Sequence, residues 1–397
     1  MRLLLLLLTV SACSVFDPSL LDDAIADAEV GVEVGPGDGA PEAEVGAPEV
    51  AVPEMRVPPG IDPSCSISGS EGVPGPPDVE NTDGDEIILG LHELVLDQDR
   101  DRWKEIGRNI DGVCTLFPDP VRICEPVTGE ETDIQVDGER GIDNVVGASL
   151  IDAIQLALSG EDLADIAETS SENGTGSLIL RINGYNGQAN DPLVEVVQAQ
   201  SVFGFAGEAD ESEPAAYEER GFDAFVPGTE DRMPFPRWDG NDWLFPRDDN
   251  FRADGSPRVR VTNAYVRDGA LYVRFIDNIP FNFASTVRGI TVRMTDVVLV
   301  VNIHESHADF GAVELSGRWQ VAELLDAART VNICPGSFEF DILERRLREL
   351  ADLPANPLDD GMATSCDALS IAVRYTFTPV RLGPISEGGV PPDTCDE

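Results

Sequence analysis

The sequence predicts a mainly β (α+β) fold, an antiparallel β-sandwich-like domain with several peripheral helices, held together by disulfides. Three observations lead to this prediction. Runs of alternating or β-branched residues recur through the second half of the chain. Helical periodicity is confined to a few scattered segments, and the cysteines are dispersed rather than spaced as metal ligands. Because strands and helices do not alternate regularly, an antiparallel sheet is favoured over a parallel one.

The expected strands are short and bounded by turn residues. They span residues 177–183, 193–203, 258–266, 271–276, 290–303, 313–316 and 369–378. Residues 267–270 carry an Asp-Gly pair, which predicts a tight hairpin turn. Residues 183–187 contain Asn-Gly twice and predict a second turn. The proline- and charge-rich residues 206–257 are expected to cross the surface as a long excursion.

Helical spacing of apolar residues predicts a small number of helices. They span residues 149–158, 162–167, 319–328 and 338–350. The last has the clearest signal, since Ser337 can cap its N-terminus after Pro335 and Gly336. Its apolar residues fall on one face and its arginines on the other, which is typical of a helix packed on a core.

The N-terminus has the layout of a secretory signal. Arg2 precedes an unbroken leucine run that ends at Leu8, and small residues follow. This run is far shorter than the roughly 20 apolar residues needed to span a bilayer. The segment from Val10 to Cys13 resembles the lipobox of bacterial lipoproteins. The resemblance implies cleavage before Cys13 and lipidation of its thiol, and Ser14 then favours sorting to the outer membrane.

The first sixty residues are expected to stay outside the folded part. Residues 14–60 consist almost wholly of Ala, Glu, Val, Gly, Pro and Asp, and such a composition buries too little apolar surface to fold. The predicted organisation is therefore a signal peptide over 1–12, a lipidated cysteine with an acidic disordered tether over 13–60, and a globular β-rich domain over 61–397.

The remaining cysteines predict a disulfide framework. With Cys13 set aside for the lipid, their number is even, as expected for an exported disulfide-bonded domain. They are Cys65, Cys114, Cys124, Cys334, Cys366 and Cys395. The proline-rich loop between Cys114 and Cys124 favours that pair, and Cys334–Cys366 and Cys65–Cys395 would complete the set. The sequence alone does not choose among the pairings.

The net charge of −47 limits the partners. Nucleic acids and anionic membrane surfaces both require cationic protein surface, so neither is expected to bind. The acidic excess favours solubility or the capture of divalent cations, and a saline habitat would select the same composition.

Clustered acids with Asn and Gly predict a calcium site before residue 149. Calcium takes six to eight oxygen ligands, and acids in a turn can converge on one ion. The candidate metal ligands are Asp137, Glu139, Asp143 and Asn144. The alternative is a set of plain turns and helix caps, because Asp-Gly turns arise by composition in so acidic a chain.

No catalytic signature is present in the sequence. The chain contains no P-loop, no GxSxG and no GxGxxG, and His304 and His307 are one residue too close for the zincin motif. A non-enzymatic role is therefore expected. Trp238 and Trp243 lie among Asp, Asn and Arg, which is typical of sugar-stacking surfaces. The alternative is that both rings cover the core beneath a loop.

Three short segments, 103–115, 141–144 and 366–370, resemble uncharacterised exported lipoproteins of Gram-negative bacteria. The resemblance would extend over most of residues 85–385 and implies export without implying an activity. The expected function is that of a lipid-anchored surface protein, a non-enzymatic interaction or structural module stabilised by calcium. The alternative is a protein that binds or processes glycans through Trp238 and Trp243. The expected partners are the membrane, through the lipid, and a glycan or protein at the cell surface.

Overall fold

The computed structural model describes most of the chain after residue 72. The described residues are 73–82, 84–95, 98, 101–116, 121–127, 134–150, 174–209, 235–275, 279–283, 290–329, 333–387 and 395. The predicted signal peptide, lipidated Cys13, tether and Cys65 lie outside them. So do the expected helix at 162–167 and all but the first residues of the one at 149–158.

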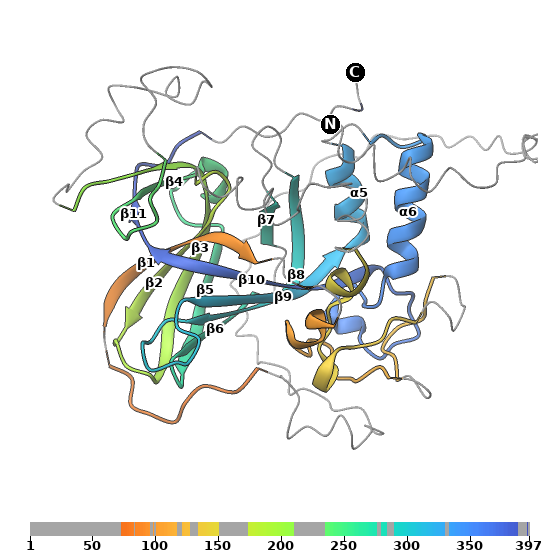
Figure 1. Ribbon diagram of the computed structural model, residues 1–397, viewed down its shortest axis with the longest axis horizontal. Coiled ribbons are helices and arrows are strands. Elements are labelled where there is room, and N and C mark those ends of the chain that lie inside the picture. Colours follow the sequence, from red (N-terminus) through yellow and green to blue (C-terminus); the bar gives the residue numbers. More distant parts are fainter. Residues whose placement is uncertain are drawn as a thin grey trace, which may run out of the picture.

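Eight strands close into an antiparallel barrel (Figure 1). Around the ring the order is β3, β2, β1, β10, β9, β8, β6, β5 and back to β3. The bounds are β1 Asp85–Val95, β2 Leu178–Tyr185, β3 Asp191–Phe205, β5 Val259–Arg267, β6 Ala270–Phe275, β8 Ile290–Asn302, β9 Ala312–Gln320 and β10 Ala368–Pro379. The prediction of a mainly β, antiparallel, disulfide-bonded fold is confirmed, whereas the sandwich is wrong.

The ring closes through β3. This strand pairs with β2 along one edge and with β5 along the other, from Asp191 opposite Val266 to Gln198 opposite Val259. Two register shifts in the β3–β5 pairing bend the strands, as bulges do in barrels. A sandwich and a barrel share the same inward–outward alternation, so the sequence pattern did not distinguish them.

Three further strands lie outside the ring. They are β4 Trp243–Pro246, β7 Ile279–Phe283 and β11 Arg381–Leu382. β4 extends the sheet from the end of β3, β11 joins it in parallel, and β7 pairs with β8. Since β4 is buried throughout, the expected surface excursion over 206–257 is wrong at these residues.

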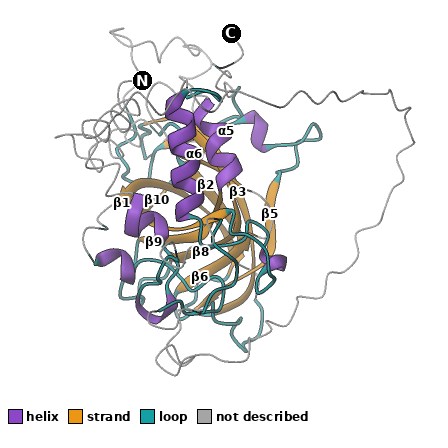
Figure 2. Cartoon of the chain, turned by 90° about the vertical axis from the view of Figure 1, so that its right-hand side faces the viewer, coloured by secondary structure: helices purple, strands orange, loops and turns teal. Residues whose placement is uncertain are grey.

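The barrel is filled by one apolar core. Every second residue of each strand points inward, as the pleat requires. Buried members from the eight strands include Leu89, Leu91, Leu180, Ile182, Val194, Val196, Ala264, Val266, Leu271, Val273, Leu299, Val301, Val313, Leu315, Leu369 and Ile371. The helices α5 Val321–Arg329 and α6 Phe338–Leu350 contribute to the same core and lie side by side beside the sheet (Figures 1 and 2).

Local sequence signals set several boundaries. The Ser337 hydroxyl accepts a hydrogen bond from the Phe340 N–H at 3.2 Å, so the predicted N-cap of α6 is confirmed. Asp268 and Gly269 have φ values of 52° and 89° between the paired Arg267 and Ala270, which confirms the predicted hairpin turn. No helix in the described ranges is long and apolar enough to cross a membrane.

The disulfides join segments that are far apart in sequence. Cys124 bonds to Cys366 across 242 residues, and Cys334 bonds to Cys395 across 61 residues. The expected pairs Cys114–Cys124, Cys334–Cys366 and Cys65–Cys395 are therefore wrong, although Cys114 is also disulfide-bonded. The pairing is set by a contact between distant segments, in which the Cys366 N–H donates to the Glu125 carbonyl at 2.9 Å. This contact places Cys366 beside Cys124 rather than beside a cysteine that is close in sequence.

Candidate functional site: an aspartate-lined cavity

The side chains of Gln98 and Asn144 take the place of a strand at the edge of β10. β1 pairs with β10 only as far as Val95 opposite Arg374. Beyond that point the Gln98 Nε2 donates to the Ala372 carbonyl at 2.9 Å, and the Asn144 Oδ1 accepts from the Ala372 N–H at 3.0 Å. The two amides also bond to each other at 2.8 Å. This edge contact positions the loops that carry the acidic residues.

Replacing Asn144 is expected to destabilise the fold. The side chain is 1% exposed and also accepts from the Gly147 N–H at 3.0 Å. Asn144→Ala would leave several buried polar groups without partners, each costing about 1–3 kcal/mol. We expect a loss of about 3 kcal/mol in the free energy of unfolding, measured by urea denaturation. Gln188→Ala, which removes an exposed amide, is the control and should change stability little. An equal, small effect of both substitutions would contradict this assignment.

Four aspartates line one small cavity beside the Cys124–Cys366 disulfide. They are Asp111, Asp137, Asp143 and Asp352. The cavity volume is about 20 Å³, which is room for one water molecule or an ion of similar size. Asp143 is 1% exposed, whereas the other three are partly exposed.

Backbone donors hold each carboxylate in place. The Asp143 Oδ2 accepts from the Ile110 N–H at 2.7 Å and the Asp111 N–H at 3.3 Å. The Asp137 Oδ2 accepts from the Thr115 N–H at 2.5 Å. Asp352 accepts from both the N–H and the hydroxyl of Ser370, at 2.7 and 2.6 Å. Loops from both ends of the sequence thus direct their acids to the same place.

Burial and mutual repulsion make these carboxylates resist ionisation. Desolvation is the main cause and raises the pKa of Asp111 to about 6 and that of Asp352 to about 7. The pKa values of Asp137 and Asp143 are raised well above the usual range, first by desolvation and then by the neighbouring aspartates. Backbone N–H donors oppose the shift without cancelling it. The fold has therefore gathered four carboxyl groups where ionising them costs free energy.

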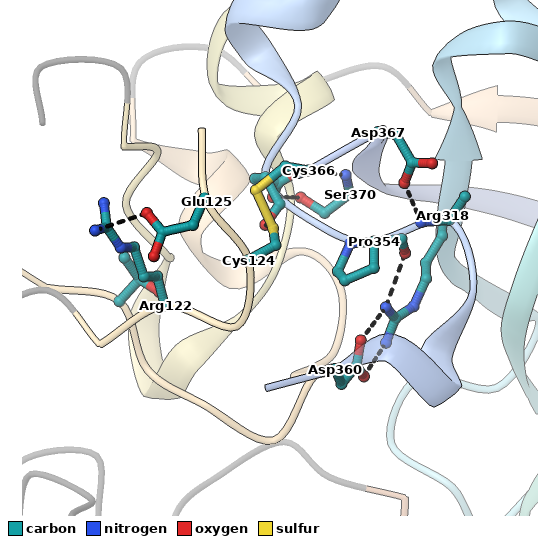
Figure 3. The surroundings of a disulfide bond; sticks show 12 residues. Arg122, Cys124, Glu125, Arg318, Pro354, Asp360, Cys366, Asp367 and Ser370 are labelled. Atoms are coloured by element: carbon teal, nitrogen blue, oxygen red, sulfur yellow. Dashed lines mark hydrogen bonds and ion pairs between the residues drawn. A yellow bond between two sulfur atoms is a disulfide. The ribbon is translucent and has the colours of Figure 1, made fainter. Parts of the chain in front are cut away.

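The buried cation that acts on Asp111 is already engaged by other carboxylates. Arg318 is fully buried and forms a bidentate pair with Asp360, with both N–O distances 2.6 Å (Figure 3). Its Nη1 also donates to the Pro354 carbonyl at 3.0 Å, and its Nε lies 3.5 Å from the Asp296 carboxylate. The Arg318 charge lowers the pKa of Asp111, but two carboxylates already share it. Arg122 also lines the cavity, but its guanidinium pairs with Glu125 at 2.8 Å. The four aspartates of the cavity therefore outnumber the cations that could compensate them.

The donor set matches a hard cation. Carboxylate oxygens are the ligands that calcium prefers, and a bound divalent ion reverses the cost of clustering them. Within the described ranges, no three His, Cys, Asp or Glu side chains already stand in positions to hold a metal ion. Binding would thus require the carboxylates to turn toward the cavity.

The structure brings together half of the predicted metal ligands. Asp137 and Asp143 line the cavity, whereas Glu139 is exposed and Asn144 supports β10. Asp111 and Asp352 were missed. Asp111 precedes Gly112, the same Asp-Gly pairing that occurs at Asp137 and Gly138, whereas Asp352 comes from the other end of the chain and has no local signal.

The two tryptophans are mostly covered. Trp243 is 6% exposed and packs with Phe203, Phe205 and Phe245. Trp238 is partly buried, and its ring stacks on His92 with centroids 4.3 Å apart. Sugar stacking needs an exposed ring face, so glycan binding stays a prediction that this placement does not favour.

No protein-family model matches the chain, and searches of curated proteins and of solved structures each found no match.

Proposed function

We propose that the chain is an exported lipoprotein, anchored to the outer membrane through Cys13, whose barrel serves as a non-enzymatic interaction module stabilised by calcium. The leucine run and the segment from Val10 to Cys13 support export and lipidation. Disulfides between distant segments are typical of oxidising compartments outside the cytosol. The anchored end and the tether would hold the barrel away from the membrane, where a partner can reach it.

The observation that carries the calcium proposal is the cavity. Asp111, Asp137, Asp143 and Asp352 come from separate loops and meet in about 20 Å³. Desolvation disfavours the charged form of each carboxyl, and the Asp143 carboxylate is also repelled by the other three. A divalent cation removes that repulsion and satisfies the oxygens that face the cavity. It would also connect the segment 111–143 to residue 352, close to the Cys124–Cys366 disulfide.

Thermal unfolding of the oxidised chain tests this proposal. Saturating calcium at about 100 times its dissociation constant stabilises a native-state site by about 2.7 kcal/mol. We expect the midpoint to rise by about 5 °C or more relative to the chain in excess chelator. Magnesium should raise it less, because it demands stricter octahedral geometry.

Asp143→Asn provides the sharpest control. It removes one buried negative charge and keeps the acceptor for Ile110. Without calcium this variant should be at least as stable as the wild type, and its response to calcium should be lost. Asp326→Asn, an exposed change of the same charge on α5, should retain the full response. An equal calcium response in Asp143→Asn would show that the ion binds elsewhere on the acidic surface.

A further inference from the structure

A second cavity lies on the outer face of the barrel, and it is much larger. This groove has a volume of about 510 Å³, within the range of small-molecule sites. Its floor includes a cross-strand row in which Tyr272 of β6 is opposite Val300 of β8, Val300 is opposite Glu314 of β9, and Glu314 is opposite Arg374 of β10. Residues of the turns at 105–108 and 139–142 and of the loop at 307–309 form its sides.

An ion triad forms one end of the floor. The Glu314 carboxylate is 14% exposed and lies between two guanidiniums. The Arg108 Nε is 2.8 Å from its Oε1, and the Arg374 Nη2 is 3.4 Å from its Oε2. Two guanidiniums therefore lie against this one carboxylate.

The Arg374 guanidinium retains binding capacity. Its side chain is 42% exposed. Among the described residues its Nη2 makes all the polar contacts, to Glu314 and to the Glu105 carbonyl at 3.0 Å. The Nε and Nη1 hydrogens are therefore available to a ligand, and charge-assisted hydrogen bonds to a carboxylate are the strong kind. The other charges of the groove, Glu105, Glu139, Arg140 and Asp309, are exposed at its rim.

The other end of the floor is apolar and aromatic. The Tyr272 ring stacks on Tyr265 with centroids 5.5 Å apart. Ala270 and Val300 belong to the same outer apolar cluster, against which Val73 packs. Val300 lies two strands from Arg374 across the row and Tyr272 lies three strands away, so a ligand seated against Arg374 can extend toward an apolar surface.

We propose that this groove binds a small organic anion, with a carboxylate against Arg374 and an apolar or aromatic portion directed along the floor toward Val300 and Tyr272. The interaction module would then recognise its ligand here. This site shares no residue with the aspartate cavity, so loss of the calcium response would leave the proposal untouched.

Titration of the oxidised chain with benzoate tests the proposal. Benzoate combines a carboxylate with an aromatic ring, acetate lacks the ring, and benzylamine reverses the charge. Measured by calorimetry or by NMR, benzoate should bind more tightly than acetate, and benzylamine should not bind. Arg374→Gln should weaken benzoate binding at least about tenfold, because the charge-assisted hydrogen bonds from the guanidinium to the carboxylate are lost. Arg346→Gln, an exposed change of the same charge on α6, should have no effect.

Several results would overturn the proposal. No benzoate binding to the wild type would do so, as would equal binding of benzylamine, and neither needs a variant. Equal weakening by Arg374→Gln and Arg346→Gln would indicate a nonspecific charge effect. Phosphate binding as tight as benzoate would remove the role assigned to Tyr272 and Val300. The unfolding midpoint of each variant, measured without ligand, separates lost binding from lost folding.

Discussion

Without calcium, the free energy of unfolding is expected to fall by about 4 kcal/mol or more as pH rises from about 5 to about 8. The cause is the aspartate cavity. Burial raises the pKa of Asp352 to about 7 and that of Asp111 to about 6. In the unfolded chain these carboxyls titrate near their ordinary value of about 3.9. The native state therefore holds protons at pH 5 that the unfolded chain has already released.

The sign follows from proton linkage. Where the native state binds more protons than the unfolded state, stability falls with rising pH. The loss begins above the unfolded pKa and is complete once pH exceeds the raised native pKa values. Asp352, shifted from 3.8 to about 7, contributes about 4 kcal/mol over its whole titration range, of which roughly 2.7 kcal/mol falls between pH 5 and pH 7. Asp111, shifted to about 6, adds roughly 1.4 kcal/mol between pH 5 and pH 6, so the two together give the expected fall of about 4 kcal/mol. Asp137 and Asp143 act in the same direction.

Urea denaturation at a series of pH values, in chelator, measures this effect. The general repulsion of so acidic a chain also grows with pH, so the control must isolate the cavity. Asp143→Asn should flatten the profile, whereas Asp326→Asn should leave its slope unchanged. Calcium should restore stability at pH 8 and have little effect at pH 5, where protons occupy the carboxylates. A profile that is flat from pH 5 to pH 8 would show that the four acids do not titrate in this range.

Removing the Cys124–Cys366 disulfide is expected to cost about 5 kcal/mol. The bond closes a loop of 242 residues, and the chain-entropy model gives a stabilisation that grows with the logarithm of loop length. The double variant Cys124→Ala, Cys366→Ala should lower the free energy of unfolding accordingly. Since both cysteines line the aspartate cavity, the calcium response should weaken as well.

The second disulfide is the matched control. Cys334–Cys395 closes a loop of 61 residues, and the same model gives about 4 kcal/mol for its removal. Neither cysteine lines the cavity, so its double variant should keep the calcium response. Denaturation with and without calcium measures both quantities. A larger loss for the shorter loop, or an unchanged calcium response without Cys124–Cys366, would contradict this account.

Local patterns in the sequence were sufficient to predict most of the strands and the two long helices of the structure. Seven expected strands and two helices correspond to β2, β3, β5, β6, β8, β9, β10, α5 and α6. They were predictable because alternation, capping by Ser337 and the Asp-Gly turn at 268–269 act within a few residues. β1 was missed although it is central to the ring; its sequence DEIILGLHELV mixes charges into the apolar run. The short β4 was missed because it lies within a proline- and charge-rich stretch.

The sequence alone showed the acidic composition, predicted disulfides and identified Asp137 and Asp143 as candidate ligands. Only the tertiary structure decided the closure of the barrel, the disulfide partners and the meeting of Asp352 with Asp111. Each depends on pairing between residues far apart in the chain. The sequence pattern fixes which face of a strand is buried, but not which strand lies beside it. The same holds for the groove. Its floor runs from Tyr272 on β6 to Arg374 on β10 across β8 and β9, and the sequence around these two residues does not predict that the four strands lie side by side.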